Sequence, residues 1–200
     1  FTEGESDLSA KTHLSYDGAD RIRTVVDPKG LSTAYLRNGL GDLLWQRSPD
    51  TGDTAFENDA NGMPVTETPA DARKVERAYD ATGRVTTVTY SDGTRTAFTY
   101  DAPAPLCVAD GTFANGRLST VTERDGSTTF CYDFAGRVIQ KTQVTRGVRL
   151  DVRYAYTKAG RLAAITYPDG RRFFYLRDAA GDVTGVDMQA GGPKQTIASD

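Results

Sequence analysis

Hydrophobic and polar residues alternate over short runs along this chain, and turn residues separate the runs. Residues 84–90 read RVTTVTY and residues 94–100 read TRTAFTY, both rich in threonine, valine and tyrosine. β-Branched and aromatic residues in runs of this length, bounded by glycine and aspartate, predict β-strands joined by hairpin turns. No stretch keeps a helical period over a useful length, so the pattern predicts an all-β fold.

Each run has two alternating sets of side chains, and neither set is uniformly apolar. In residues 161–167 the sets are Arg, Ala, Ile, Tyr and Leu, Ala, Thr, and residues 84–90 are similarly mixed. A strand of a β-sandwich would present one much more apolar face to the partner sheet. We therefore expect a single curved layer of antiparallel hairpins, wet on at least one side and ordered by ladders of like residues.

A turn signal recurs at a nearly constant interval. It comprises Asp20 followed by Gly41, Gly62, Gly83, Gly116, Gly136, Gly160 and Gly181, at spacings of 21, 21, 21, 33, 20, 24 and 21. A second turn signal follows each of these about nine residues later, for example Ser91-Asp92-Gly93 and Pro168-Asp169-Gly170. The period predicts that residues 1–200 form about eight two-stranded units of roughly 21 residues, or roughly sixteen strands.

The first turn signal has a physical basis in its residue types. A type I turn favours Asp or Asn at its first position and Gly at its fourth, where a left-handed conformation is needed. The pairs at this separation are Asn38 with Gly41, Asp59 with Gly62, Asp80 with Gly83, Asp133 with Gly136, and Asp178 with Gly181. Because the same acid recurs in unit after unit, we interpret it as a structural turn residue and predict no catalytic residue.

The interval from Gly83 to Gly116 is longer than the others, and its excess falls at residues 102–115. Two prolines close together exclude a central strand there. We expect an inserted loop or extra hairpin that leaves the ribbon and carries Cys107.

Cys107 and Cys131 are the chain's two cysteines, too few for a zinc cage. They are either a disulfide or two free thiols. A disulfide would close a loop of about 24 residues and stabilise the fold by roughly 3 kcal/mol in the chain-entropy model.

The charge and hydrophobicity of the chain limit the classes of partner that it can bind. A formal net charge of −3 and a pI near 5.3 argue against a nucleic-acid backbone or an anionic membrane as the main partner. No apolar run approaches the roughly 20 residues that a transmembrane helix needs. The chain begins without Met or a signal peptide, so we expect a segment of a longer protein.

The sequence motifs that would indicate a metal site, a catalytic site or a cofactor site are incomplete. Residues 57–62 begin like a calcium loop, but Thr68 stands where the bidentate carboxylate belongs, so no metal site is predicted. His13 is the sole histidine, and no cofactor motif is complete. Trp45 and Tyr167 could stack on sugars, although ladder packing is the favoured role. We expect no enzyme and no cofactor.

The repeat resembles that of the RHS/YD-repeat family, whose unit is Tyr-Asp, two variable residues, Gly-Arg, an aliphatic residue, a Pro-Asp-Gly-like turn and an aromatic-rich return strand. The matching stretches are Tyr79-Asp80 with Gly83-Arg84-Val85, Tyr132-Asp133 with Gly136-Arg137-Val138, Tyr156 with Gly160-Arg161-Leu162, and YPDG at 167–170. Three units depart from the Tyr, with Arg37, Asn58 and Arg177, and three from the Arg, with Asp42, Met63 and Asp182.

The resemblance implies that the repeats form a long β-strip wound into a hollow shell. In bacterial members, the polymorphic Rhs toxins and the cocoon-forming Tc toxin components, the shell encloses a C-terminal toxin; in animal teneurins a similar barrel serves adhesion. The expected function is a shell segment that encapsulates such a toxin in interbacterial competition. The expected partners are the toxin domain, the remaining repeats and a secretion apparatus, in a protein made in the cytoplasm and exported. The alternative is a surface adhesin or carbohydrate-binding repeat protein.

Residues 27–31, DPKGL, resemble the string that family members carry near the self-cleavage site that closes the shell. That site belongs after the last repeat, whereas this copy lies in the first unit. We therefore interpret it as a Pro-Gly turn.

Overall fold

The computed structural model describes residues 10–107 and 112–199, which contain 17 strands and no helix. The strands are β1 (His13–Tyr16), β2 (Ile22–Val26), β3 (Ser32–Arg37), β4 (Leu43–Ser48), β5 (Gly52–Asn58), β6 (Pro64–Thr68), β7 (Val75–Tyr79), β8 (Val85–Tyr90), β9 (Arg95–Tyr100), β10 (Leu118–Glu123), β11 (Gly126–Tyr132), β12 (Val138–Thr145), β13 (Val148–Tyr156), β14 (Leu162–Thr166), β15 (Arg172–Arg177), β16 (Val183–Gln189) and β17 (Gln195–Ser199).

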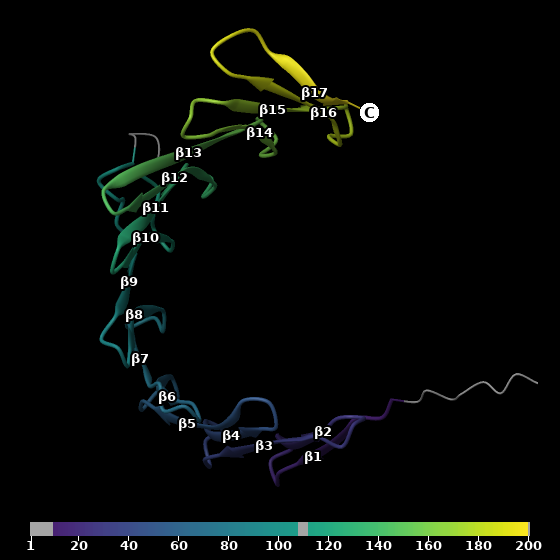
Figure 1. Cartoon of the computed structure of the whole chain (residues 1–200), viewed down its shortest axis with the longest axis vertical. Coiled ribbons are helices and arrows are strands. Elements are labelled where there is room, and N and C mark those ends of the chain that lie inside the picture. The colour runs from purple at the N-terminus through teal and green to yellow at the C-terminus, as the bar shows by residue number, and fades with distance from the viewer. Residues whose placement is uncertain (1–9, 108–111, 200) are drawn as a thin grey trace, which may run out of the picture. The chain divides into compact units, whose positions relative to one another are not determined.

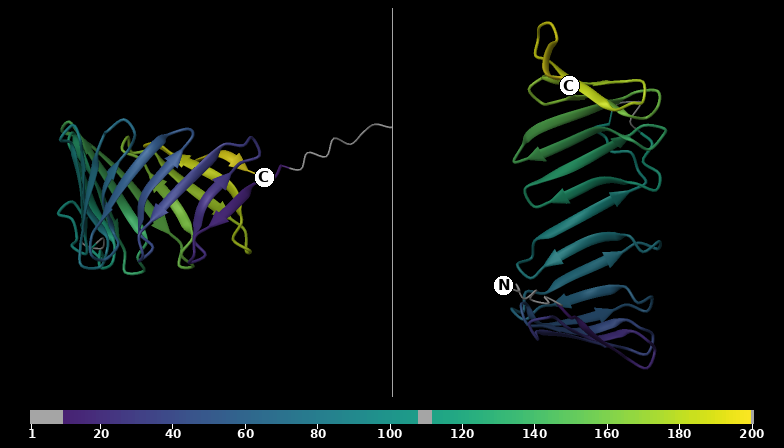
Figure 2. Two further views of the ribbon diagram at one scale, coloured as in Figure 1. Left: turned by 90° about the horizontal axis from the view of Figure 1, so that it is seen from below. Right: turned by 90° about the vertical axis from the view of Figure 1, so that its right-hand side faces the viewer.

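The strands divide into two compact units, residues 1–95 and 96–200. In the first unit, each strand from β1 to β8 pairs antiparallel with the next strand in sequence. In the second, the same holds from β9 to β17. Each unit is one layer of hairpins with turns at both ends of its strands (Figures 1 and 2). The predicted all-β, antiparallel hairpin meander is confirmed.

One turn geometry recurs at both ends of the strands. The amide of the first turn residue donates to the carbonyl of the fifth, and the amide of the fourth donates back to the first. In one example Asp80 N lies 2.9 Å from Arg84 O and Gly83 N lies 3.0 Å from Asp80 O; in another Tyr167 and Gly170 make the same bonds. Gly83 and Gly170 both have φ of +83°, the left-handed region that a type I turn with a G1 bulge requires.

The two faces of the second unit differ more than the residue patterns of its single strands predicted. Across four neighbouring strands, one row is half-buried and apolar: Tyr154, Ile165, Phe173 and Met188. The adjacent row, on the opposite face, is polar: Arg153, Thr166, Arg172 and Gln189. The next row on this second face includes Ala164 and Phe174, so that face is mixed as expected, whereas the apolar row of the first face runs across strands rather than along any one of them.

The insert folds back onto the sheet instead of leaving it. Thr112 forms a parallel bridge with Tyr132, and Ala104 and Ala114 are only 8% and 2% exposed. Covering the ends of β11 and β12 removes these small side chains from water, which a projecting hairpin would not do. Residues 108–111 of the predicted insert lie outside the described residues.

Within residues 10–107 and 112–199, no helix is long and apolar enough to cross a membrane.

Candidate functional site: the Tyr-Asp edge

Alternate turns of the meander carry the Tyr-Asp signal, so within each unit they lie at one end of the strands. We call this end the Tyr-Asp edge and the other end the opposite edge. The turns of the Tyr-Asp edge begin at Asp17, Asn38, Asp59, Asp80, Asp133, Thr157 and Asp178. The insert connects β9 to β10 at this same edge, in place of a turn.

The turn at Asp80 shows what its carboxylate does. Asp80 Oδ1 accepts hydrogen bonds from the amides of Thr82 (2.9 Å) and Arg84 (3.0 Å) and from the Thr82 hydroxyl (2.7 Å). Arg84 Nε donates to Asp80 Oδ2 at 2.7 Å. The Thr82 hydroxyl and the Arg84 amide hold the pKa of Asp80 well below its usual range, so this carboxylate stays ionised and fully used within the turn.

The other predicted turn acids occupy equivalent places. Asp133 accepts from the amides of Ala135 and Arg137, and its other oxygen pairs with the Arg137 guanidinium. Asp59 accepts from the amides of Asn61 and Met63. Asp59 and Asp178 retain the amide bonds without an arginine, because Met63 and Asp182 stand where the arginine would.

In one turn the side-chain donor and the side-chain acceptor exchange positions. Asn38 Oδ1 accepts from three turn amides, each at 2.9 Å, and Asn38 Nδ2 donates to Asp42 Oδ2 at 2.7 Å. Here the first position supplies the donor and the fifth the acceptor. The departure of Asp42 from the usual Arg is thus matched by Asn38 in place of Asp.

The tyrosine before each turn reaches the preceding hairpin. The hydroxyls of Tyr79, Tyr132 and Tyr156 donate to the carbonyls of Pro64, Leu118 and Val138, at 2.8, 2.7 and 2.8 Å. Pro64 and Val138 lie two residues after the glycine of the preceding Tyr-Asp turn, and Leu118 lies two residues after Gly116, which follows the insert. We call this bond the clasp.

Two of the three residues that replace tyrosine make the equivalent bond, whereas Arg37 donates to Gly41 O within its own turn. Asn58 Nδ2 donates to Leu43 O at 2.9 Å, and an Arg177 guanidinium nitrogen donates to Leu162 O at 3.1 Å. Both acceptors hold the same place after the glycine. Sequence reasoning treated Asn58 and Arg177 as loose departures; the signal it missed is that both retain an N–H that can replace the phenol O–H.

Arginine adds a further contact between hairpins. The guanidinium carbon of Arg137 lies 4.7 Å from the ring centre of Tyr156, and that of Arg117 lies 5.7 Å from Tyr132. Any other residue at position 136 would have to adopt a positive φ, and its Cβ would overlap the Arg117 guanidinium. The glycine is therefore required by both the turn and its neighbour.

The remaining sequence candidates lie apart from this edge or serve other contacts. Cys107 and Cys131 form a disulfide with a Cα–Cα distance of 5.5 Å. In the turn between β2 and β3, Asp27 accepts from the amides of Lys29 and Leu31, so the DPKGL string forms a hairpin turn.

The two candidate ligand-contact aromatics have protein neighbours. The Trp45 ring lies 4.9 Å from the guanidinium carbon of Arg47, which also pairs with Asp53. Tyr167 is 43% exposed and packs edge-to-face on Phe173 at 5.5 Å. Arg47 occupies one side of the Trp45 ring, whereas Tyr167 remains open to solvent.

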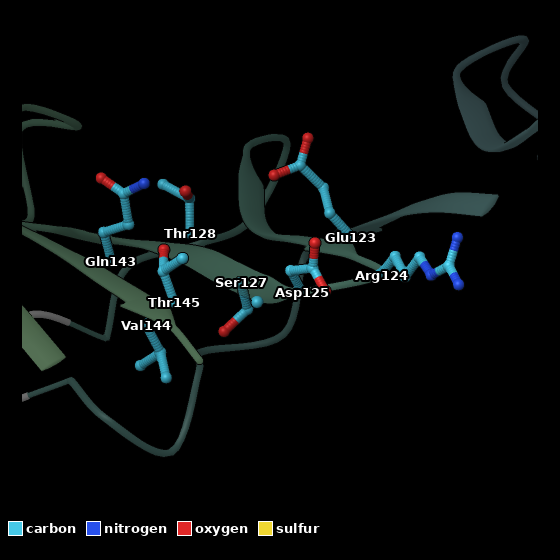
Figure 3. Close-up of a pocket in the computed structure, with 9 residues that line it drawn as sticks. Glu123, Arg124, Asp125, Ser127, Thr128, Gln143, Val144 and Thr145 are labelled. Atoms are coloured by element: carbon cyan, nitrogen blue, oxygen red, sulfur yellow. The ribbon is translucent and has the colours of Figure 1, made fainter. Parts of the chain in front are cut away.

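A groove of about 350 Å³ lies at the opposite edge, around the turn between β10 and β11. Figure 3 shows Glu123, Thr128 and Gln143 on one side of the strands and Ser127 and Val144 on the other. The lining side chains therefore do not converge on one point. Among the residues that the structure describes, no group of three or more His, Cys, Asp or Glu could hold a metal ion.

Comparison with known proteins shows which family has this repeat. The RHS Repeat pattern matches residues 59–95, 79–102 and 132–172. A curated relative, double-stranded DNA deaminase toxin A of Burkholderia cenocepacia (strain H111), is 30% identical over 161 residues, 76% of this chain and 11% of that protein.

Solved structures share the fold. The crystal structure of TcdB2-TccC3-Cdc42 matches with a TM-score of 0.77 at 17% identity, over 94% of this chain and 11% of that one. The Tc holotoxin pore of Photorhabdus luminescens matches with a TM-score of 0.75 at 18% identity, over the same shares. The chain thus spans about a tenth of the length of each protein that it matches.

Proposed function

The chain is a segment of RHS repeats, and we propose that it forms part of the wall of a shell enclosing a C-terminal toxin domain of the same polypeptide. The relatives that share its repeats or fold include a deaminase toxin and Tc toxin complexes. The wall would act by physical exclusion, keeping the toxin inside and proteases outside. Its role is structural rather than enzymatic.

The observation that carries this proposal is the clasp. A wall needs its hairpins to stay side by side, since separated strands would open a gap. Each clasp adds a side-chain bond to the backbone ladder between successive hairpins, such as Tyr156 to Val138 and Tyr132 to Leu118. Because Asn58 and Arg177 make the same bond, the chain retains a donor at these positions rather than a particular side chain.

The wall's two surfaces suit a container. In the second unit, one face carries the apolar row of Tyr154, Ile165 and Phe173, and the other carries a polar row of arginines and threonine beside Ala164 and Phe174. A face of half-buried apolar groups can contact a protein cargo, while the polar face tolerates water. The remaining repeats of the polypeptide would supply the strands that pair with β1 and β17, and an exported effector is the expected carrier, delivered by a secretion apparatus.

Protease protection tests the proposal on the full-length protein that carries this segment. We expect its C-terminal domain to survive a protease that digests the same domain produced alone. Tyr156→Ala should increase the rate of digestion by about a hundredfold, because it removes a clasp together with its ring contacts. Tyr167→Ala, which changes a tyrosine at the opposite edge, is the matched control and should increase the rate by no more than about fivefold.

Two results would contradict the shell. One is equal digestion of the C-terminal domain with and without the repeats. The other is glycan-array binding by the full-length protein that disappears in Trp45→Ala or Tyr167→Ala, which would favour the carbohydrate-binding alternative.

A further inference from the structure

Buried side chains of the described residues are concentrated in the insert and in strands β10–β12. Apart from Thr66 and Ala164, all of them belong to the insert or to β10–β12: Ala104, Ala114, Ser119, Thr129, Cys131, Gln140 and Thr142. Elsewhere the described strands keep their side chains at least partly exposed. We call Ala104–Cys107 the cover segment.

Two buried side chains of β12 are polar and do not require burial. Gln140 is 1% exposed and Thr142 is fully buried, yet both are polar. Gln140 Nε2 donates to Thr142 Oγ1 at 2.9 Å, and the Thr142 hydroxyl bonds to Asp151 Oδ1 at 2.6 Å. Gln140 Oε1 has no hydrogen-bond partner among the described residues. Exposure to water would satisfy this oxygen, so burial is a cost here.

The neighbouring strands show that this face tolerates water. Gln140 pairs with Arg153, which pairs with Thr166, and these two continue the same cross-strand row beyond the insert. Arg153 is exposed and Thr166 is half-buried.

The cover segment gains little from packing. Ala104 is its one fully buried side chain, while Leu106 is 36% exposed and Phe113, where the insert returns, is 48% exposed. Its side-chain hydrogen bond to the sheet, from Gln140 Nε2 to Leu106 O, is long at 3.4 Å. Among the contacts of residues 10–107 and 112–199, the covalent bond from Cys107 to Cys131 is therefore the main restraint on this segment.

We propose that Cys107–Cys131 is a thiol–disulfide exchange site at which a dithiol reductant releases the cover segment. Cys107 is half-buried and Cys131 is fully buried, so the sulfur open to attack is Cys107 Sγ. A thiolate of the reductant forms a bond to Cys107 Sγ, the Sγ–Sγ bond breaks, and Cys131 leaves as a thiolate that takes up a proton.

The second thiol of the reductant completes the reaction. As its thiolate, it attacks the reductant sulfur of the mixed disulfide, and Cys107 leaves and is protonated. The reductant departs as a disulfide after passing two electrons and two protons to the protein. Without the bond, the cover segment leaves the face of β11 and β12, and water reaches Gln140 and Thr142.

The decisive test is the reactivity of one thiol in the full-length protein with Cys107→Ser. If the bond holds the cover segment, Cys131 becomes accessible and an alkylating probe labels it quickly. The matched control is Thr166→Cys in a Cys107→Ser, Cys131→Ser background, which places a thiol on the same row outside the insert. We expect the two labelling rates, read by peptide mass spectrometry, to agree within about tenfold. Labelling of Cys131 about a hundredfold slower than the control would show that packing holds the cover segment, and would overturn the proposal.

A second measurement uses the unaltered protein and so does not depend on a variant folding. Native full-length protein is treated with dithiothreitol, and hydrogen exchange is followed by mass spectrometry. We expect both cysteines to become reduced and the amide of Cys107, bonded to Ala104 O at 3.0 Å, to exchange at least about tenfold faster. Peptides of β15 and β16 should not change. An intact disulfide after prolonged native treatment, or reduction without faster exchange in the cover segment, would contradict the proposal.

Discussion

The same backbone turn occurs at both ends of the strands, for example at Asp133 and at Tyr167, but the two edges differ in what joins successive hairpins. At the Tyr-Asp edge, Tyr156 donates to the preceding hairpin and Arg137 lies over its ring. At the opposite edge, Tyr90 and Tyr167 begin their turns and are 45% and 43% exposed. A turn alone closes a hairpin. Side-chain contacts between hairpins are added at the Tyr-Asp edge.

The acids differ between the edges in the same way. Asp133 stands first in its turn, and its ion pair with Arg137 is 13% and 29% exposed at the two side chains. Asp169 stands third in its turn and pairs with Arg171, where the exposures are 46% and 56%. Ion pairs as open as the second contribute little to stability. Comparable substitutions at the two edges should therefore have unequal effects.

Truncating tyrosine should give the largest contrast. In Tyr156→Ala we expect local stability to fall by about 3 kcal/mol, because a half-buried ring, the clasp and the Arg137 contact are lost together. In Tyr167→Ala the loss should be about 1 kcal/mol, since that ring contacts mainly Phe173. Hydrogen exchange of β12–β14 in the full-length protein measures both. Equal losses would remove the distinction between the edges.

Adding a methyl group to the turn glycines should give a smaller contrast. Gly136→Ala and Gly170→Ala both place alanine at positive φ, +79° and +83°, at a cost of about 1 kcal/mol each. At Gly136 the new Cβ must also displace the Arg117 guanidinium, whereas at Gly170 no atom lies within 4 Å. We expect about 1 kcal/mol more destabilisation at Gly136, measured as the difference in local exchange protection.

Removing one hydroxyl isolates the clasp. Tyr156→Phe keeps the ring but leaves Val138 O without the phenol donor, so we expect a loss of about 1 kcal/mol. Burial raises the pKa of Tyr156, so its hydroxyl remains protonated as the donor at neutral pH. Tyr167→Phe should be nearly neutral by the same exchange measurement. An unchanged Tyr156→Phe variant would show that packing, not the hydrogen bond, joins the hairpins.

Much of the fold could be predicted from the sequence because its determinants are local. The pairing of Asp80 with Gly83 specifies a turn within four residues, and a fixed period repeats it. The apolar row of Ile165 and Phe173 could not be found this way, since it exists only once strands are placed side by side. The same holds for the insert, whose contact with Tyr132 depends on strand register.

The candidate site was predicted in part. The acids were identified as turn residues from their spacing alone. The clasp was missed because its donor and acceptor, such as Tyr156 and Val138, are 18 residues apart and one of them is a backbone carbonyl, which leaves no trace in the sequence. Asn58 and Arg177 could have been grouped with tyrosine by asking what the three side chains can donate.

Acid sensitivity should give the smallest contrast between the edges. Burial raises the pKa of Asp133, but the Arg137 side chain and amide lower it more, so the folded-state value lies below the ordinary one. A lowered pKa stabilises the fold above the unfolded value of about 3.9, and this contribution disappears as pH falls through the folded value. Asp133→Asn should keep the amide bonds, as Asn38 does, and lose the ion pair with Arg137.

We therefore expect Asp133→Asn to lower local stability by about 0.5 kcal/mol at pH 7 and by progressively less as pH falls below about 4 and through the lower folded pKa of Asp133, where the wild-type carboxylate loses its charge. Asp169→Asn should show a smaller difference with the same sign, because the backbone and side chain of Arg171 lower the pKa of that more exposed acid. Hydrogen exchange at several pH values, corrected for the intrinsic rate, measures both variants. A difference for Asp133→Asn that stays constant from pH 7 to pH 3 would mean that the charge of Asp133 does not stabilise its turn.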